Sequence, residues 1–163
     1  MRITMVISSL DCGGAERVMS TMANYWAERG EEVTILSFDH GDPPFYPLHP
    51  RVRHRPLGWA AESSDIWQGL FWNLRRIRVL RHAVRGSRPD VVISFVDKVN
   101  TLTLLATRGL GFPVIVEEIV ERPFANWSTL NWKGKAAAFT KQILWWLGQH
   151  GSGEWIYFRA RKA

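Results

Sequence analysis

The chain has 163 residues, of which 46% are hydrophobic and 22% charged, and it contains a single cysteine. This composition excludes a wholly disordered protein, a collagen-like repeat and a disulfide scaffold, and the length suffices for one hydrophobic core. A lone cysteine cannot form an internal disulfide, so we expect a reducing, cytoplasmic location. No apolar run approaches the roughly 20 residues that span a bilayer, and the N-terminus is too quickly interrupted for a signal peptide.

The net charge of +6 is unevenly distributed. Residues 1–125 contain 15 basic and 14 acidic residues, whereas residues 126–163 contain six basic residues and one acid. The near-neutral larger part argues against nucleic-acid binding, which needs a concentrated positive patch. One local cluster, the basic stripe, consists of Arg75, Arg76, Arg78, Arg81, Arg85 and Arg88. Such a stripe attracts phosphates or acidic lipid headgroups, and the alternative is an ordinary solvated helix face.

Strand and helix patterns alternate along the first half of the chain. A buried strand over 3–8 leads into a turn with two glycines, and apolar residues at helical spacing predict a helix that Gly30 ends. A second strand is predicted over 33–38, followed by a proline-rich loop and a short edge strand over 52–57.

The alternation continues with a long helix over 66–85, a strand over 91–95, a helix over 99–108 and a strand over 114–116. These strands are nearly continuous β-branched runs, which is typical of parallel sheets covered on both sides. The pattern therefore predicts an α/β fold, a Rossmann-like parallel sheet with helices on both faces.

The pattern degrades after residue 125. Residues 126–163 hold five of the nine tryptophans, with a helix pattern over 136–147 and a strand pattern over 154–158. We therefore divide the chain into a Rossmann-like domain over 1–125 and a divergent, tryptophan-rich basic tail over 126–163, which we expect to be partly ordered.

The turn at Gly13 and Gly14 is the most informative local feature. Adjacent glycines let a ligand approach the backbone, and the following helix N-terminus offers free N–H groups that suit a phosphate. Neither the dinucleotide fingerprint nor a Walker loop is present. A plain tight turn is the alternative.

Four segments together resemble the family-4 glycosyltransferases, retaining GT-B enzymes that use nucleotide-activated sugars. The segments are GGAERV at 13–18, RPDVVISF at 88–95, DKVNT at 97–101 and GFPVIVEE at 111–118. The resemblance covers residues 1–122. It implies the N-terminal, acceptor-side half of a GT-B enzyme that transfers a hexose from a nucleotide sugar to a glycan or a lipid-linked acceptor in cell-envelope polysaccharide synthesis.

The resemblance also implies what surrounds the site. It places Gly13, Gly14 and Ala15 near the donor diphosphate, whose developing charge the backbone amides would stabilise. It places Asp97, Lys98 and Glu118 at the cleft. Asp97 could instead cap the next helix, and Glu118 could be an ordinary strand-end acid. The resemblance leaves the catalytic residues unassigned.

Two departures from the family pattern qualify this picture. Ile119 stands where an arginine commonly follows Glu118, and a displaced Glu-Arg-Pro occurs at 121–123. The donor-binding second domain has no counterpart in the chain. We therefore expect a truncated transferase that is inactive alone, with a second-half polypeptide as one partner; a shifted reading frame or a recombination is one hypothesis for the tail.

Other ligands are expected as follows. The histidines show no metal-ligand spacing, so we predict no metal and no cofactor beyond the nucleotide-sugar donor.

Trp67, Phe71 and Trp72 beside the basic stripe suit a peripheral contact with the inner face of a membrane, although we favour core packing for them. The alternative to a transferase domain is a non-catalytic module that binds an anionic ligand or a membrane surface.

Overall fold

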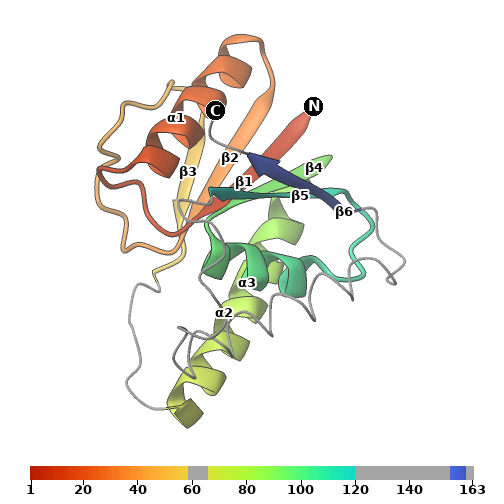
Figure 1. Cartoon of the computed structure of the whole chain (residues 1–163). Helices are drawn as coiled ribbons and strands as arrows, with labels where there is room; N and C mark the ends of the chain where they lie inside the picture. The colour runs from red at the N-terminus through yellow and green to blue at the C-terminus, as the bar shows by residue number, and fades with distance from the viewer. Residues whose placement is uncertain (59–65, 120–154, 161–163) are drawn as a thin grey trace.

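The computed structural model describes residues 1–58, 66–119 and 155–160 (Figure 1). In chain order the elements are β1 (Arg2–Ile7), α1 (Gly14–Glu28), β2 (Glu32–Ser37), β3 (Arg53–Pro56), α2 (Ile66–Ser87), β4 (Val91–Phe95), α3 (Asp97–Thr107), β5 (Val114–Ile119) and β6 (Trp155–Ala160). Apart from β3, which follows β2 directly, strands and helices alternate up to β5, as the apolar spacing predicts.

The strands form a single sheet in the order β3-β2-β1-β4-β5-β6. Every neighbouring pair is parallel, with Met5 of β1 opposite Ile35 of β2 and Ile93 of β4. The Rossmann-like α/β prediction is confirmed. The strand predicted over 154–158 is also confirmed, because β6 pairs with β5. The helix predicted over 136–147 lies outside the described residues.

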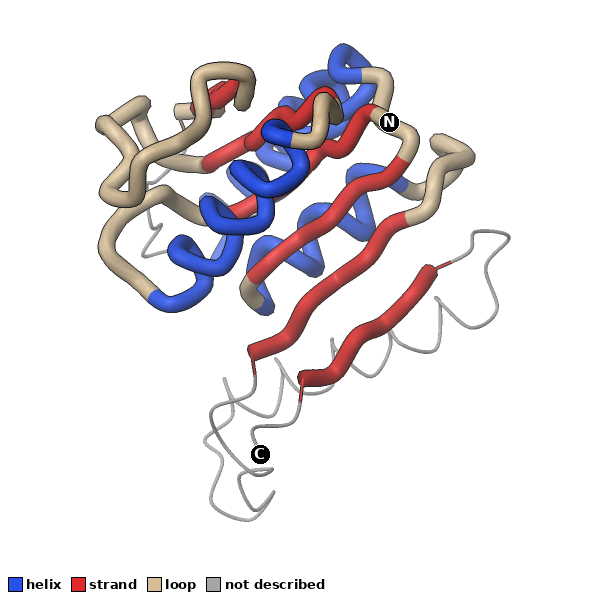
Figure 2. The backbone as a smooth tube through the Cα atoms, turned by 90° about the horizontal axis from the view of Figure 1, so that it is seen from above, coloured by secondary structure: helices blue, strands red, loops and turns tan. Residues whose placement is uncertain are grey.

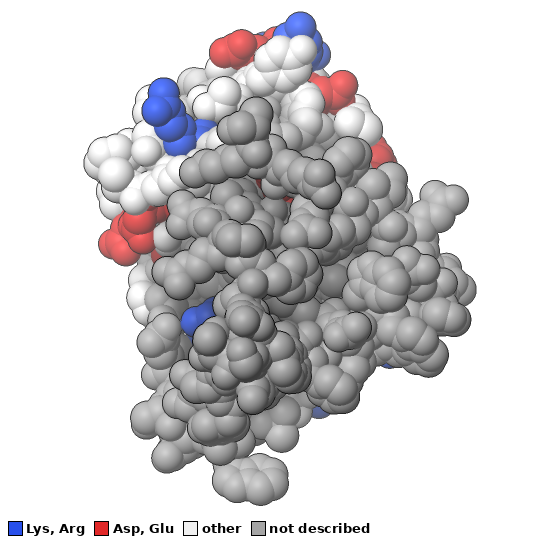
Figure 3. Space-filling view, viewed as in Figure 1, with Lys and Arg blue, Asp and Glu red and all other residues white. Residues whose placement is uncertain are grey.

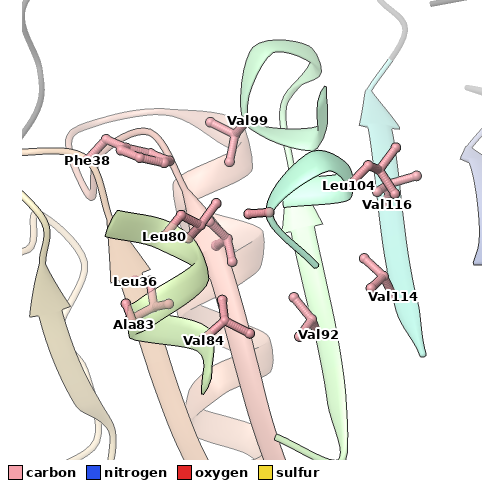
Figure 4. Close-up of a cluster of buried hydrophobic side chains, with 12 residues drawn as sticks. Leu36, Phe38, Leu80, Ala83, Val84, Val92, Val99, Leu104, Val114 and Val116 are labelled. Carbon is pink, nitrogen blue, oxygen red and sulfur yellow. The ribbon is translucent and has the colours of Figure 1, made fainter. Parts of the chain in front are cut away.

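Alternate side chains of β1 pack on opposite faces of the sheet. On one face Ile3, Met5 and Ile7 of β1 pack with α1 in a buried cluster. On the other face Val6 packs with the apolar side of α2 and α3, in the cluster that Figure 4 shows. Within the described residues α1 therefore covers one face, and α2 and α3 cover the other (Figure 2).

The N-terminal half of α2 departs from the prediction. Leu80 and Val84 are buried, but Leu74 is 50% exposed and Trp72 is 37% exposed. Figure 1 shows the reason, because this half of α2 extends beyond the edge of the sheet. Core packing of Trp72 is thus wrong, and the side chains of Trp67 and Phe71 lie outside the description. None of the described helices is long and apolar enough to cross a membrane.

A buried polar cluster joins the edge strand β3 to β2. The Ser37 hydroxyl donates to Oδ1 of Asp39 at 3.1 Å and lies 2.7 Å from Nε2 of His54. Because the hydroxyl proton goes to the carboxylate, the His54 Nε2–H donates to Ser37. Burial lowers the pKa of His54, and the attraction of Asp39 offsets part of this effect. His54 therefore favours its neutral form.

Candidate functional site

The order in which the chain adds strands to the sheet changes direction at the neighbouring strands β1 and β4. From β1 it crosses through α1 to β2 on one side, whereas from β4 it crosses through α3 to β5 on the other side. In open parallel sheets this reversal opens a crevice at the carboxyl ends of the two strands, where ligands bind. The two loops that leave β1 and β4 therefore define the candidate site.

The first loop contains the glycine corner, which we define as Gly13, Gly14 and Ala15. Gly13 has extended backbone angles and precedes the first helical residue, Gly14. A Cβ on Gly14 would meet no atom within 4 Å. This side of the corner is therefore open to a ligand, as a phosphate-facing turn requires.

The space beside Gly13, unlike that beside Gly14, is occupied by a side chain. A Cβ at this position would collide with the Glu16 carboxyl, whose Cδ would lie 2.8 Å away. Glu16 is the third residue of α1, so its carboxylate folds back over the helix N-terminus, as the acid of a capping box does. A carboxylate there is stabilised by the helix dipole and competes with any incoming anion. Sequence reasoning missed this role, although the spacing from Gly13 was its signal.

The second loop is a single residue, Val96, between β4 and α3. Its backbone has φ +75° and ψ +132°, a conformation that β-branched residues rarely adopt. The side chain is 36% exposed, so little packing compensates for the strain. Strained backbone of this kind concentrates at ligand-binding corners and marks Val96 as part of the candidate site. Nothing in the sequence around Val96 signals it.

The first turn of α3 contains two of the predicted cleft residues. The helix begins at Asp97 and Val96 is its N-cap, without a side-chain hydrogen bond. The predicted start at residue 99 is therefore wrong by two residues, and Asp97 is not the N-cap. Lys98 is exposed in the same turn. Glu118 lies near the end of β5, the next strand over, where it is in register with Arg159 of β6.

Asn100 connects this turn to β5. It is 7% exposed, its side-chain amide donates to the Glu117 carbonyl at 2.8 Å, and its backbone N–H donates to the Val96 carbonyl at 2.8 Å. Burial raises the pKa of the Glu117 carboxyl. These contacts fix the α3 corner against the end of β5.

The loop between β2 and β3 packs beside the glycine corner. The N–H of Phe45 donates to the Leu10 carbonyl at 2.8 Å. Asn24 of α1 donates to the Pro47 carbonyl at 2.9 Å and accepts from the His49 N–H at 2.7 Å. The proline-rich loop is therefore fixed both to the β1–α1 loop and to α1.

Two aromatic residues of this loop, the aromatic pair Phe45 and Tyr46, were not singled out by sequence reasoning. Their ring centroids are 5.0 Å apart at an interplanar angle of 78°. Burial raises the pKa of the Tyr46 phenol, and the Cys12 thiol raises it further while Arg17 lowers it. Cys12 and Arg17 flank the glycine corner in the chain.

The basic stripe has mixed roles. Arg81 donates to the carbonyls of Ala106 and Arg108 at 2.7 and 2.8 Å, and so closes the C-terminal end of α3. Arg75 instead lies over the exposed Trp72, with its guanidinium carbon 5.9 Å from the ring centroid. The stripe is therefore partly a structural clamp and partly an aromatic and basic surface on α2.

Surface charge and metal-ligating side chains indicate no further site among the described residues. Where the described side chains are visible in Figure 3, positive and negative groups alternate around the upper part of the molecule. Within residues 1–58, 66–119 and 155–160, no three His, Cys, Asp or Glu side chains gather as a metal site.

Solved structures with the same architecture define the class of fold. Sucrose-phosphate synthase from Thermosynechococcus elongatus superposes with a TM-score of 0.64 at 8% identity, over 98% of this chain and 48% of that protein. MurG from Acinetobacter baumannii gives 0.63 at 16% identity, over 99% of this chain and 42% of that protein. The fold is the Rossmann-like α/β fold of GT-B glycosyltransferases.

The family follows from the sequence match. The model described as "Glycosyl transferase 4-like domain" matches residues 13–158, so the chain belongs to this family and carries a glycosyltransferase-like domain. The resemblance inferred from the four segments is confirmed. The match runs past residue 125, while the division into a domain and a tail stays a prediction.

A curated relative from Campylobacter jejuni is 33% identical over 118 residues, which are 72% of this chain and 32% of the relative. Its name is GalNAc-alpha-(1->4)-GalNAc-alpha-(1->3)-diNAcBac-PP-undecaprenol alpha-1,4-N-acetyl-D-galactosaminyltransferase. The chain thus spans about a third of the length of that relative. The comparisons support a transferase domain and give no support to a stand-alone binding module.

Proposed function

We propose that this chain is the acceptor-side half of a glycosyltransferase that moves a sugar from a nucleotide sugar to a lipid-linked glycan. The observation that carries the proposal is the reversal of chain direction between β1 and β4, which places the glycine corner and the first turn of α3 at neighbouring strand ends. Family membership and the lipid-linked acceptor in the name of the relative support it.

In this proposal the role of each residue follows from its chemistry. The backbone amides at Gly14 and Ala15 would stabilise the negative charge that develops on the leaving diphosphate. Lys98 would supply a positive charge to a phosphate, and Asp97 and Glu118 would accept hydrogen bonds from sugar hydroxyls. The donor itself would be bound mainly by a second polypeptide or domain, and these 163 residues alone would catalyse little or no transfer.

Glu16 adds a condition to this scheme. Its carboxylate lies over Gly13, so a diphosphate would approach from the open side, at Gly14, or would displace the carboxylate. A carboxylate that holds the helix N-terminus until the donor arrives keeps the corner ordered in the free protein.

A binding experiment tests the acceptor-side role on the 163-residue chain. An undecaprenyl-diphosphate-linked N-acetylgalactosamine glycan is titrated in detergent, with undecaprenyl diphosphate as the control for recognition of the lipid alone. We expect saturable binding that depends on the glycan, and no appreciable sugar transfer when UDP-N-acetylgalactosamine is added. Equal binding of the two lipids, or robust transfer by this chain alone, would contradict the proposal.

A peripheral contact with the cytoplasmic face of a membrane is the second part of the proposal. The observation that favours it is the exposure of Trp72 and Leu74 next to Arg75 on the half of α2 that extends past the sheet. Aromatic, aliphatic and basic side chains on one helix suit an anionic lipid interface.

Vesicle co-sedimentation tests this contact. The chain should sediment with phosphatidylglycerol vesicles at low salt, and Trp72→Ala with Leu74→Ser should reduce the bound fraction several-fold. Tyr25→Ala, which removes an exposed aromatic ring from α1, serves as the control. Failure to bind anionic vesicles at low salt would rule the contact out.

A further inference from the structure

Phe45 is exposed in a way that the packing of its loop does not explain. Its side chain is 61% exposed, whereas the backbone around it is fixed by hydrogen bonds to Leu10 and, through Asn24, to α1. Single exposed apolar residues are common on protein surfaces. An aromatic ring whose backbone is tied down at several points is instead pre-organised, which lowers the entropic cost of binding a ligand.

The ring orientation leaves a flat surface available. Tyr46 meets Phe45 at an interplanar angle of 78°, so the two rings pack edge to face rather than stacked. Tyr46 is half-buried, while Phe45 remains largely exposed. Phe45 therefore presents an apolar surface next to the glycine corner, at the edge of the sheet where ligands of such folds bind.

The charge around Phe45 indicates which ligand would stack there. Exposed Asp11 follows Leu10, whose carbonyl binds the Phe45 N–H, and exposed Asp42 precedes Phe45 by three residues. Carboxylates accept hydrogen bonds from sugar hydroxyls. An aromatic ring offers its face to the axial C–H groups of a pyranose, so the combination suits an uncharged sugar.

We propose that Phe45, whose ring packs edge to face with Tyr46, forms a stacking platform for a pyranose ring of the acceptor glycan. The platform rests on the proposed acceptor-side function and names a specificity-determining residue for it. It lies on the β2 side of the glycine corner, and Asn24 is a positioning residue that acts through Pro47 and His49.

The experiment is a titration of the ¹⁵N-labelled 163-residue chain with methyl α-N-acetylgalactosaminide, followed by amide shifts in NMR spectra. We expect saturable shifts centred on Phe45, Tyr46 and Leu10. Phe45→Ala should weaken binding several-fold, up to about tenfold, the effect of losing one stacked ring. Phe45→Trp should keep the affinity within about threefold, because a larger ring preserves the stacking surface. Tyr25→Ala is the control for loss of an exposed ring elsewhere.

Several outcomes would overturn the platform. These are an absence of saturable binding of the glycoside, unchanged affinity in Phe45→Ala when its thermal unfolding matches that of the wild type, or a response of the Phe45 amide to UDP rather than to the glycoside. The last outcome would assign the ring to a nucleobase. Binding of the lipid-linked glycan that is indifferent to Phe45→Ala would remove the platform alone, whereas loss of glycan-dependent binding in the wild type would remove the proposed function.

Discussion

The two corners at the candidate site, where a strand passes into a helix, differ in their residues and in their backbone conformation. At the end of β1, two glycines remove side chains from an unstrained turn, and Glu16 covers part of the helix N-terminus. At the end of β4, a single valine is held at φ +75° with no side-chain cap. The first corner is open because its glycines lack side chains, and the second is fixed by the hydrogen bonds that Asn100 donates to the carbonyls of Val96 and Glu117. One suits ligand access and the other suits rigid positioning.

The largest effect should come from removing the support beneath the strained corner. Phe95 precedes Val96 and is fully buried. Phe95→Ala should destabilise the protein by about 3–5 kcal/mol, as truncation of a buried phenylalanine does. Urea unfolding measures this loss. Phe45→Ala is the matched control, because the same substitution at an exposed ring should change stability by less than about 0.5 kcal/mol. A small effect at Phe95 would show that the corner does not depend on this packing.

Relief of the strain itself should have the opposite sign. Val96→Gly removes a side chain from a conformation that favours glycine, and the relief of about 1–3 kcal/mol should exceed the entropic cost of about 0.5–1 kcal/mol. We expect a net gain of about 1 kcal/mol in the free energy of unfolding. Val96→Ala retains a Cβ at the same backbone angles and should show no such gain. A glycine variant that is less stable than the wild type would disprove the strain.

The glycine corner can be closed without harming the fold. Gly14→Ala places a methyl group in open space at the first position of α1, so it should raise stability by about 0.4–1 kcal/mol while reducing pyrophosphate affinity several-fold. Gly86→Ala in α2 should give a similar gain and leave pyrophosphate binding unchanged. Calorimetric titration with pyrophosphate compares the two variants, and equal affinity in both would separate the corner from diphosphate binding.

The smallest effect should come from Glu117, a partly buried acid of β5. Burial raises the pKa of Glu117, so the unfolded chain releases this proton at lower pH, and ionisation of Glu117 reduces stability as pH rises through its folded-state pKa. Glu117→Gln should therefore stabilise the protein at pH 7, by about 0.5 kcal/mol or less given the partial exposure of the group. The gain should shrink toward pH 4. Glu28→Gln controls for loss of a surface charge, and a pH-independent difference would contradict this assignment.

The sequence predicted the sheet well because its strands are buried on both faces and their apolar runs are unambiguous. It predicted an open backbone at the glycine corner because glycine has no side chain, and this property follows from the residue type alone. It gave no sign of Val96, because a positive φ at a β-branched residue has no signature in the neighbouring sequence. Trp72 was misassigned because helical periodicity describes a face of α2 but not where the sheet beneath it ends.

The aromatic pair shows a further limit of sequence reasoning. Phe45 lies in a proline-rich loop with no periodic pattern, and its neighbour Leu10 is 35 positions away in the chain. Asn24 fixes that loop with both ends of its side-chain amide, and such a long-range contact has no local signature. Residues of this kind become visible only when the chain is folded.

The Ser37, Asp39 and His54 cluster makes one margin of the sheet sensitive to acid. Since burial lowers the pKa of His54, the unfolded chain binds a proton first as pH falls below about 6.5, and the tie between β3 and β2 weakens there. β3 has only four residues, so its release would uncover the backbone of β2 as a template for intermolecular pairing. Mild acid should therefore accelerate amide exchange in β3 first and promote self-association, and His54→Gln should suppress this pH dependence.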